Sequence, residues 1–495
     1  MEKGFLYPDE TGDVLKNNCY TTTKKYFNAK LISMKKTFFL VYILFLNLCW
    51  TGAQKKGEQW ENLFNGKDLN GFRQLNGKAK YIVQNGEIIG TTVLNEPNTF
   101  LATEKEYGDF IFEVDFKVNE NMNSGVQFRS EIKDANDNCK VSDKRTPERV
   151  HGYQMEIDPS DRGWSGGIYD EARRGWLYSM ENNPAAKTAF KNNQWNHYRI
   201  ECIGNSIRTW VNGIACAHLI DDMTPKGFIA LQVHAINDLK NVGEEIRWKN
   251  VRIQTRNLKS SPDDNVYVVN TLINNISADE KRMGVKLLWD GKTTEGWRGA
   301  NKDYFPDNTW YIKDGTLNVT KGSNAESQNG GDIVTKEEFS AFDLQFEFQL
   351  TDTANSGVKY FVTEKEKTSG SAIGLEYQVL DDDKHPDAKL GSIGNRTLAS
   401  LYDLIPAKKN GREKLSIGEW NRGRIIVFPD GRTEHWLNGW KVLEYQRGTQ
   451  YFYALVAKSK FVNIPDFGMA AKGHILLQEH GTHVAYRSIK IKELK

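Results

Sequence analysis

Several stretches of the chain alternate between apolar and polar residues with a period of two, the pattern of half-buried β-strands. The clearest are Phe110 to Val118 (FIFEVDFKV) and Phe342 to Leu350 (FDLQFEFQL). Tyr198 to Ile203 and Ser206 to Val211 flank Gly204-Asn205, which predicts a β-hairpin with a two-residue turn. Convincing amphipathic helices are scarce. The pattern predicts an all-β protein built from antiparallel sandwiches of the jelly-roll kind.

Short motifs recur in the same order in both halves of the chain, which is the signature of an internal repeat. The pairs are 64–73 with 289–298, Asn123-Ser-Gly-Val126 with Asn355-Ser-Gly-Val358, Trp195-Asn196 with Trp420-Asn421, Trp210-Val-Asn-Gly213 with Trp436-Leu-Asn-Gly439, and Gln232-Val-His234 with Gln478-Glu-His480. We therefore predict two copies of one module, residues 57–258 and 284–495. Residues 259–283, with a Ser-Ser-Pro-Asp-Asp turn segment, join them.

Residues 34–53 have the pattern of a secretory signal peptide: two lysines, an apolar run and small residues placed for cleavage. This interpretation makes Met34 the expected start, residues 1–33 an upstream extension, and the protein periplasmic or extracellular. The apolar run is shorter than the roughly 20 residues of a spanning helix, so no membrane span is expected. Cys49 follows the apolar run and is a possible lipidation site, but Asn47 and Leu48 are unfavourable residues before a lipidated cysteine.

Charge and cysteine content narrow the function classes. The net charge of +2 over 495 residues, with no basic stripe, argues against nucleic acid as a partner. Beyond the signal segment the cysteines are Cys139, Cys202 and Cys216, an odd number without metal-type spacing. Cys202 and Cys216 are expected either to pair across strands or to be buried free thiols.

The stretch His151 to Trp176 (HGYQMEIDPSDRGWSGGIYDEARRGW) concentrates acids, arginines, glycines and tryptophans. If Tyr153 to Asp158 is a strand, Gln154, Glu156 and Asp158 project from one face and the apolar residues between them from the other. Pro159 and the glycines that follow predict that the strand ends there in a loop. The sequence therefore predicts a pair of carboxylates at a strand end.

Taken together, these repeated elements resemble the 3-keto-disaccharide hydrolase domain family, which has a concanavalin-like β-sandwich fold. Its markers here are the opening Leu-Phe-Asn-Gly-Lys-Asp-Leu, the Asn-Ser-Gly, the Trp-Asn, the Asn-Gly turn and the closing Gly-x-Ile-x-Leu-Gln. The resemblance covers both modules, from near Trp60 to Lys495. It implies a carbohydrate substrate already oxidised at carbon 3, and hence an upstream glycoside 3-oxidising enzyme.

The implied chemistry follows from the ketone. A ketone at carbon 3 acidifies the hydrogen at carbon 2, so a base can remove that proton and the enolate can expel the group at carbon 1. Water then adds to the enone. Such a site needs a general base, an electrophile for the enolate charge, and an acid for the departing oxygen.

Candidate catalytic residues in module one are Glu156 and Asp158 as base and acid, with Arg129 and His234 in support. A guanidinium is a good donor to an enolate or a carboxylate, and imidazole shuttles protons near neutral pH. A divalent metal held by Glu156, Asp158 and His234 is an open alternative, since these ligand types suit several ions. Expected substrate contacts in this module are Gln154, Trp164, Tyr169, Trp176 and Gln232.

Module two keeps part of this set, with Glu376 and His480 as catalytic candidates. Glu376 and Gln378 correspond to Gln154 and Glu156 if the preceding glycines are aligned, or to Glu156 and Asp158 if the glutamates are. Phe361 stands where module one has Arg129. Expected substrate contacts are Gln378, Asp381, Arg396 and Gln478, and the run Asp381 to Asp383 with His385 could also hold a cation.

Plainer interpretations remain for these residues. Glu156 and Asp158 could be a solvated strand face, Arg129 a structural ion-pair partner, and His234 a hydrogen-bonded core histidine. Two other functions also remain open. Glu156-x-Asp158-x-x-Asp161 resembles the acidic strand of laminarinase-like glycosidases, and a tandem carbohydrate-binding protein without catalysis has the same features.

Overall fold

The computed structural model describes residues 60–132, 149–322, 331–368, 371–411 and 415–495. The predictions for residues 1–53, including the signal peptide and its cleavage, lie outside these ranges, as does Cys139. Within the described ranges no helix is both long and apolar enough to cross a membrane.

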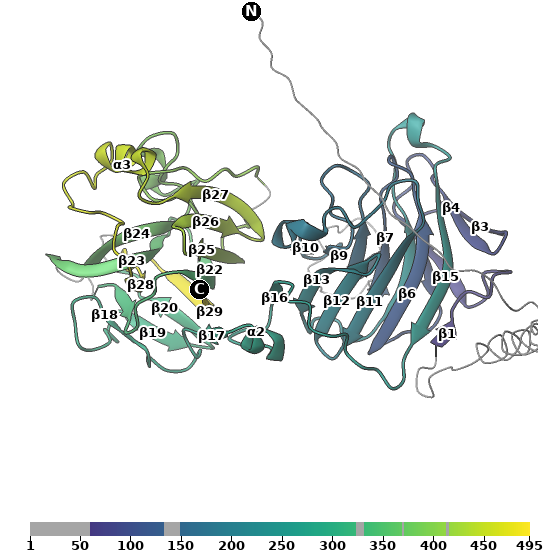
Figure 1. Cartoon of the computed structure of the whole chain (residues 1–495), viewed down its shortest axis with the longest axis horizontal. Helices are drawn as coiled ribbons and strands as arrows, with labels where there is room; N and C mark the ends of the chain where they lie inside the picture. The colour runs from purple at the N-terminus through teal and green to yellow at the C-terminus, as the bar shows by residue number, and fades with distance from the viewer. Residues whose placement is uncertain (1–59, 133–148, 323–330, 369–370, 412–414) are drawn as a thin grey trace, which may run out of the picture. The chain divides into compact units, whose positions relative to one another are not determined.

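The first half of the chain forms two antiparallel sheets that enclose a core between them (Figure 1). The larger sheet consists of β16 (Val268–Asn270), β13 (Ile214–Ile220), β12 (Ser206–Val211), β11 (Asn196–Ile203), β6 (Phe110–Lys117), β15 (Glu245–Gln254), β4 (Glu87–Thr91) and β3 (Lys80–Gln84) in spatial order, with β1 (Trp60–Asn62) added to β15. The smaller sheet, which carries the candidate residues, consists of β10 (Gly175–Tyr178), β9 (Ile168–Glu171), β8 (Val150–Ile157), β7 (Ser124–Ile132), β14 (Phe228–Val233), β5 (Thr99–Thr103) and β2 (Phe72–Asn76). Short 3₁₀ turns lie in its loops: η1 (Met180–Asn182), η2 (Pro184–Ala186) and η3 (Leu239–Asn241).

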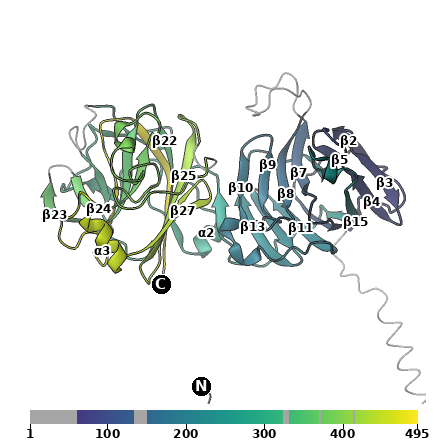
Figure 2. The same cartoon turned by 90° about the horizontal axis from the view of Figure 1, so that it is seen from above.

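The second half repeats this arrangement with its own core (Figure 2). Its larger sheet consists of β19 (Trp310–Lys313), β20 (Thr316–Val319), β29 (Val484–Glu493), β22 (Phe342–Leu350), β25 (Trp420–Val427), β26 (Arg432–Leu437) and β27 (Trp440–Gln446), with β17 (Val285–Leu287) added to β29. Its smaller sheet consists of β18 (Trp297–Gly299), β21 (Ile333–Thr335), β28 (His474–Leu477), β23 (Asn355–Thr368) and β24 (Ser371–Leu380). The prediction of two all-β sandwiches in tandem is confirmed.

Turn residues account for much of this topology. Ile203 pairs with Ser206, so Gly204-Asn205 makes the predicted two-residue turn between β11 and β12. Asn212 and Gly213 both have positive φ, 51° and 79°, as a type I′ hairpin requires. The second sandwich repeats this turn between β26 and β27. Cys202 and Cys216 are buried free thiols, the second of the two expected states.

The segment between the sandwiches has structure of its own. Strand β16 pairs in parallel with β13, and the short helix α2 (Ala278–Arg282) begins with a capping box in which Ser277 and Glu280 bond each other's backbone. The Glu280 carboxylate also accepts from Lys490 Nζ at 2.9 Å. Among the described residues, a second α-helix, α3 (Gln450–Ala457), and the 3₁₀ turn η4 (Pro386–Lys389) lie in loops of the second sandwich.

Candidate active site

The candidate site is built on the face of the first sandwich's smaller sheet that points away from the main core. Tyr153, Met155 and Ile157 of β8 belong to that core, so the alternating residues Gln154 and Glu156 lie on the opposite face. The two-faced strand predicted from the sequence is thus present, and it ends at Ile157, just before Asp158.

Glu156 is an almost fully buried carboxylate, 5% exposed. Its Oε1 accepts a hydrogen bond from Asn123 Nδ2 at 2.7 Å, and its Oε2 accepts one from Gln154 Nε2 at 2.9 Å. Burial disfavours the charged form and raises the pKa of Glu156 to about 7, and the two amide donors hold it from rising further. A carboxylate with this pKa can both take and return a proton near neutral pH.

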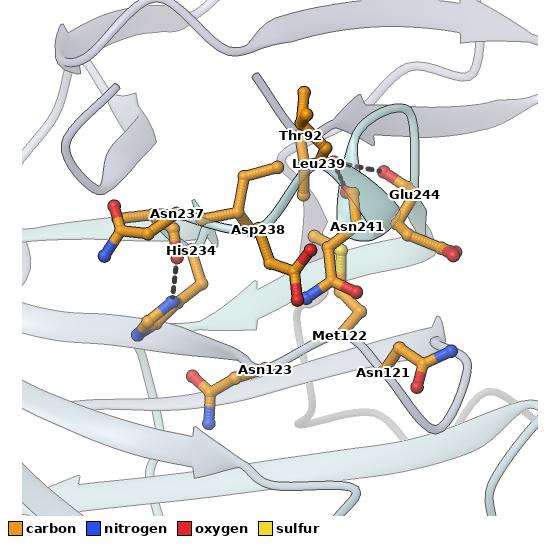
Figure 3. A pocket seen from close by; sticks show the side chains of 12 residues that line it. Thr92, Asn121, Met122, Asn123, His234, Asn237, Asp238, Leu239, Asn241 and Glu244 are labelled. Atoms are coloured by element: carbon orange, nitrogen blue, oxygen red, sulfur yellow. Dashed lines mark hydrogen bonds between the residues drawn. The ribbon is translucent and has the colours of Figure 1, made fainter. Parts of the chain in front are cut away.

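A cavity of about 600 Å³ lies beside Asn123, one of the two residues that donate to this carboxylate (Figure 3). Asn123 connects the two, since it lines the cavity while its amide nitrogen bonds Glu156. The lining is rich in amide side chains and has two acids, Asp238 and Glu244. It consists of Thr92, Asn121, Met122, Asn123, His234, Ala235, Ile236, Asn237, Asp238, Leu239, Asn241 and Glu244. Groups of this kind suit the hydroxyls of a sugar.

His234 follows β14 directly and lines the same cavity. Its Nδ1 lies 2.7 Å from the carbonyl oxygen of Ala235, drawn as a dashed line in Figure 3. When Nδ1 carries the proton and donates to that carbonyl, Nε2 of the neutral ring is left as an acceptor. His234 thus lines the same cavity as Asn123, and Asn123 in turn bonds Glu156.

The loop from His234 to Glu244 supplies most of the cavity wall. Thr92 Oγ1 donates to the carbonyl of Asn241 at 2.6 Å, and Asn119 Nδ2 donates to Glu244, so the C-terminal end of η3 and the residues after it are tied to neighbouring loops. The corresponding connection in the second sandwich, between β28 and β29, spans only residues 478–483. The wall of this cavity thus comes from a loop that the second sandwich has in a much shorter form.

Asp158 does not share the environment of Glu156. Its carboxylate accepts from the Ser160 backbone at 3.1 Å, from Ser160 Oγ at 2.6 Å and from Arg162 Nε at 2.7 Å. These bonds organise the loop after β8. Among the described residues, no group of three or more His, Cys, Asp or Glu side chains could hold a metal ion. Glu156, Asp158 and His234 thus do not gather into the metal site considered above.

Arg129 lies away from the cavity and is 1% exposed. Its Nε donates to the carbonyl of Gly108, its Nη1 to the carbonyl of Gly204, both at 2.9 Å, and its Nη2 to Asp109 at 3.1 Å. The guanidinium is therefore occupied in tying two loops together, which matches the structural alternative.

The remaining expected contacts of module one fall in different places. Gln232 is fully buried on β14, and neither atom of its side-chain amide has a hydrogen-bond partner. Trp164 is 1% exposed, with Arg162 over one ring face at 4.3 Å, so it is not free to stack on a sugar. Tyr169 and Trp176 are half-buried and pair across β9 and β10 with ring centroids 5.2 Å apart.

Strand register settles which residues of the second sandwich correspond to Glu156. Gly125 of the Asn-Ser-Gly motif lies opposite Glu156, and Gly357 of the repeated motif lies opposite Gln378. Glu376 in turn lies opposite Lys359, where the first sandwich pairs Gln154 with Gln127. The alignment by preceding glycines is therefore the one observed.

The other residues singled out in module two mostly hold loops. Asp381 accepts from the backbone of Asp383 and of Thr353, and Arg396 donates to Asp387 and Asp403. The ring of His480 lies 6.1 Å from that of His385, and Gln478 donates its backbone N–H to Gly357.

The same serine bond recurs in both sandwiches and explains part of the repeat. Ser124 Oγ donates to the carbonyl of Gln232 at 2.6 Å, and Ser356 Oγ to the carbonyl of Gln478 at 2.7 Å. The Asn-Ser-Gly motif thus joins two strands. Sequence reasoning recognised it as a marker but missed Asn123 as a ligand of Glu156, and it missed Gln127 and the cavity loop, which have no local motif.

The comparisons with known proteins agree with this repeat. A family model for the 3-keto-alpha-glucoside-1,2-lyase-like domain matches residues 59–254 and again residues 284–492. A relative from Bacteroides thetaiotaomicron named 3-keto-disaccharide hydrolase is 38% identical over an alignment of 232 residues, and the match covers 43% of this chain and 79% of the relative.

Two solved structures are also similar. A candidate glycosyl hydrolase of Parabacteroides distasonis is 29% identical, with a TM-score of 0.39, and the match covers 45% of this chain and 100% of that one. A carbohydrate-binding module from Bacillus subtilis is 14% identical, with a TM-score of 0.27, and covers 37% of this chain and 95% of that one. The family match falls once on each sandwich.

Proposed function

Because this chain belongs to the 3-keto-alpha-glucoside-1,2-lyase-like family, we propose that it is a glycosidase-type enzyme whose first sandwich cleaves 3-keto-glycosides. The observation that supports this most is the environment of Glu156. This buried carboxylate, with a pKa of about 7, is bonded to Asn123, and Asn123 lines a polar cavity together with the imidazole of His234. Removal of a proton next to a ketone requires a general base and a second proton-transfer group, and Glu156 and His234 are of these types.

In this proposal Glu156 removes the proton at carbon 2 of the 3-keto sugar. The C–H electron pair forms the enolate, and the enolate collapses to the enone as the bond from carbon 1 to the leaving oxygen breaks. His234 in its protonated form gives a proton to that oxygen. The amide side chains of the cavity wall provide neutral donors for the sugar hydroxyls and the enolate oxygen.

Hydrolysis is completed by water. Neutral His234 takes a proton from the water as its oxygen bonds to carbon 1 of the enone, and Glu156 returns its proton to carbon 2. Both residues then regain their starting protonation states, and the products are the freed alcohol and a 3-keto sugar. An ordinary glycosidase needs instead two carboxylates flanking the bond. Asp158 is a poor second carboxylate because Ser160 and Arg162 already bind it.

Isotopic labelling at carbon 2 tests this mechanism. If the C2–H bond breaks, a substrate deuterated at carbon 2 reacts more slowly, and turnover in D₂O puts deuterium at carbon 2 of the product. A deuterium-free product from D₂O and no isotope effect would contradict proton abstraction at that carbon.

For the second sandwich we propose substrate binding without turnover. Gln378, which is no base, stands at the position of Glu156, and Glu376 is displaced to a position opposite Lys359. Calorimetry of sugar binding to the full chain tests this role, which predicts a second bound sugar per chain.

We also propose that the protein is exported by residues 34–53 and works after an upstream enzyme that oxidises a glycoside at carbon 3. Cell fractionation and N-terminal sequencing of the mature protein test the first point. An N-terminus within or before residues 34–53 on the exported protein would contradict cleavage after Ala53.

A further inference from the structure

The side chain of Gln154 belongs to a chain of hydrogen bonds that all point toward Glu156. Ser130 Oγ donates to Gln127 Oε1 at 2.7 Å, Gln127 Nε2 donates to Gln154 Oε1 at 2.8 Å, and Gln154 Nε2 donates to Glu156 Oε2 at 2.9 Å. Ser130, Gln127 and Gln154 are at most 2% exposed, so water does not compete for these bonds. Donors aligned in one direction polarise one another and strengthen the last bond.

Gly125 makes room for this chain. A Cβ atom at position 125 would lie 2.4 Å from Cδ and 2.7 Å from Nε2 of Gln154, which is closer than such atoms ever pack. The amide of Gln154 therefore lies across β7 over the glycine, the only residue type that leaves it this space. The glycine of the Asn-Ser-Gly motif thus fixes where the amide meets Glu156.

The arrangement also fixes which way the side-chain amide of Gln154 faces. An amide that donates Nε2–H to Glu156 and accepts from Gln127 at Oε1 has one orientation, because the reverse would bring two oxygens together at Glu156. The chain carries no charge, so it orients the carboxylate without neutralising it as a lysine would. The second sandwich has Lys359 and Glu376 at the corresponding pair of positions.

We propose that Gln154 is a positioning residue that holds Glu156 in its reactive orientation and sets its proton affinity, with Gln127 and Ser130 supporting it. This inference rests on the proposed function, in which Glu156 is the base. All three side chains act through Glu156. Their effect on its proton affinity decreases with distance along the hydrogen bonds, in the order Gln154, Gln127, Ser130.

The test is a pH titration of Glu156 by difference infrared spectroscopy, with the carboxyl band identified by its loss in Glu156→Gln. Gln154→Met keeps the volume and removes the amide. The charged carboxylate loses a donor, so its titration midpoint should rise by about one pH unit. Gln127→Met should give a smaller rise and Ser130→Ala the smallest. Gln254→Met is the matched control, because Gln254 is buried on β15 of the larger sheet and donates to the carbonyl of Arg256, away from these bonds, so the midpoint should not move.

Kinetics provide the second readout. The acid limb of the kcat/KM profile on a 3-keto-glucoside should move upward with the infrared midpoint, in the same order of variants. An unchanged midpoint in a folded Gln154→Met protein, or equal shifts for Gln154→Met and Gln254→Met, would overturn the inference. A protein that titrates as expected but does not turn over keto sugars would instead overturn the proposed function alone.

Discussion

Gln378 occupies in the second sandwich the position that Glu156 occupies in the first. Each lies opposite the glycine of an Asn-Ser-Gly motif, so the correspondence is set by hydrogen-bonded register and not by similarity of sequence. The two sandwiches therefore share a framework and differ at the residue that the chemistry depends on.

The first sandwich has Glu156 where the second has Gln378, so we predict that only the first sandwich is catalytically active. Glu156→Gln removes the base while keeping its shape, and should lower kcat by about 10²- to 10⁴-fold. Glu376→Gln, the matched change in the second sandwich, should leave kcat within about twofold, since Glu376 corresponds to Gln154 and not to the base. Steady-state kinetics on one 3-keto-glucoside compare them. A larger loss from Glu376→Gln would move the active site to the second sandwich.

The pH dependence of activity follows from the raised pKa of Glu156. The base must be ionised, so kcat/KM should rise with pH along an acid limb with its midpoint near 7. A carboxylate with an unshifted pKa would give an acid limb near 4.5. A profile flat from pH 5 to 8 would contradict the assignment of Glu156.

The stability of the folded protein should also depend on the ionisation of Glu156, but it should fall as pH rises, whereas activity increases. The pKa of Glu156 is raised from 4.5 to about 7 on folding, so the folded state binds the proton more tightly. The contribution of Glu156 to the free energy of unfolding is fully present below about pH 4.5 and is lost as pH rises through about 7, a change of about 3 kcal/mol. Glu156→Gln should therefore gain stability relative to wild type as pH rises from 4.5 to 8. Thermal unfolding of both proteins at several pH values measures this, and a difference that is constant with pH would contradict it.

The paired glycines give a steric test. In Gly125→Ala the new Cβ meets Gln154, and in Gly357→Ala it meets Glu376 Oε1 at 2.2 Å, so the local strain is similar. Only the first change disturbs Glu156. We expect Gly125→Ala to lower kcat/KM by about tenfold or more and Gly357→Ala to have little effect, because a small misplacement of a catalytic group is costly. Equal losses would indicate that the strain alone, and not the position of Gln154, governs activity.

Arg129 should affect stability and leave the proton chemistry alone. Arg129→Ala removes donors from the carbonyls of Gly108 and Gly204 and leaves a cavity, which should cost about 3 kcal/mol or more of stability. The acid limb of kcat/KM should stay where it is, since the guanidinium has no bond to Glu156. A shifted acid limb in a folded Arg129→Ala protein would restore the catalytic role expected from the sequence.

The fold was predictable from local patterns. Alternation in Phe110 to Val118 and the Gly204-Asn205 turn depend on period and turn geometry, which act within a few residues and appear in the structure as expected. The repeat then extended the prediction from one sandwich to two.

The site was only partly predictable, because its contacts join distant segments. Asn123 meets Glu156 across 33 positions of sequence, and the cavity wall comes from the loop after β14. The pattern placed Glu156 on the correct strand face, but it could not show that Asp158 and Arg129 bind loops. An Asp or Arg looks the same in the sequence whether its role is catalytic or structural, and only its contacts in the fold distinguish the two.

The most direct test of the central claim compares one 3-keto-glucoside with its unoxidised parent, using wild type and Glu156→Gln. The account predicts that wild type cleaves the keto sugar and leaves the parent intact, and that Glu156→Gln cleaves neither at a comparable rate. Cleavage of the parent by wild type, or full activity of Glu156→Gln on the keto sugar, would contradict it.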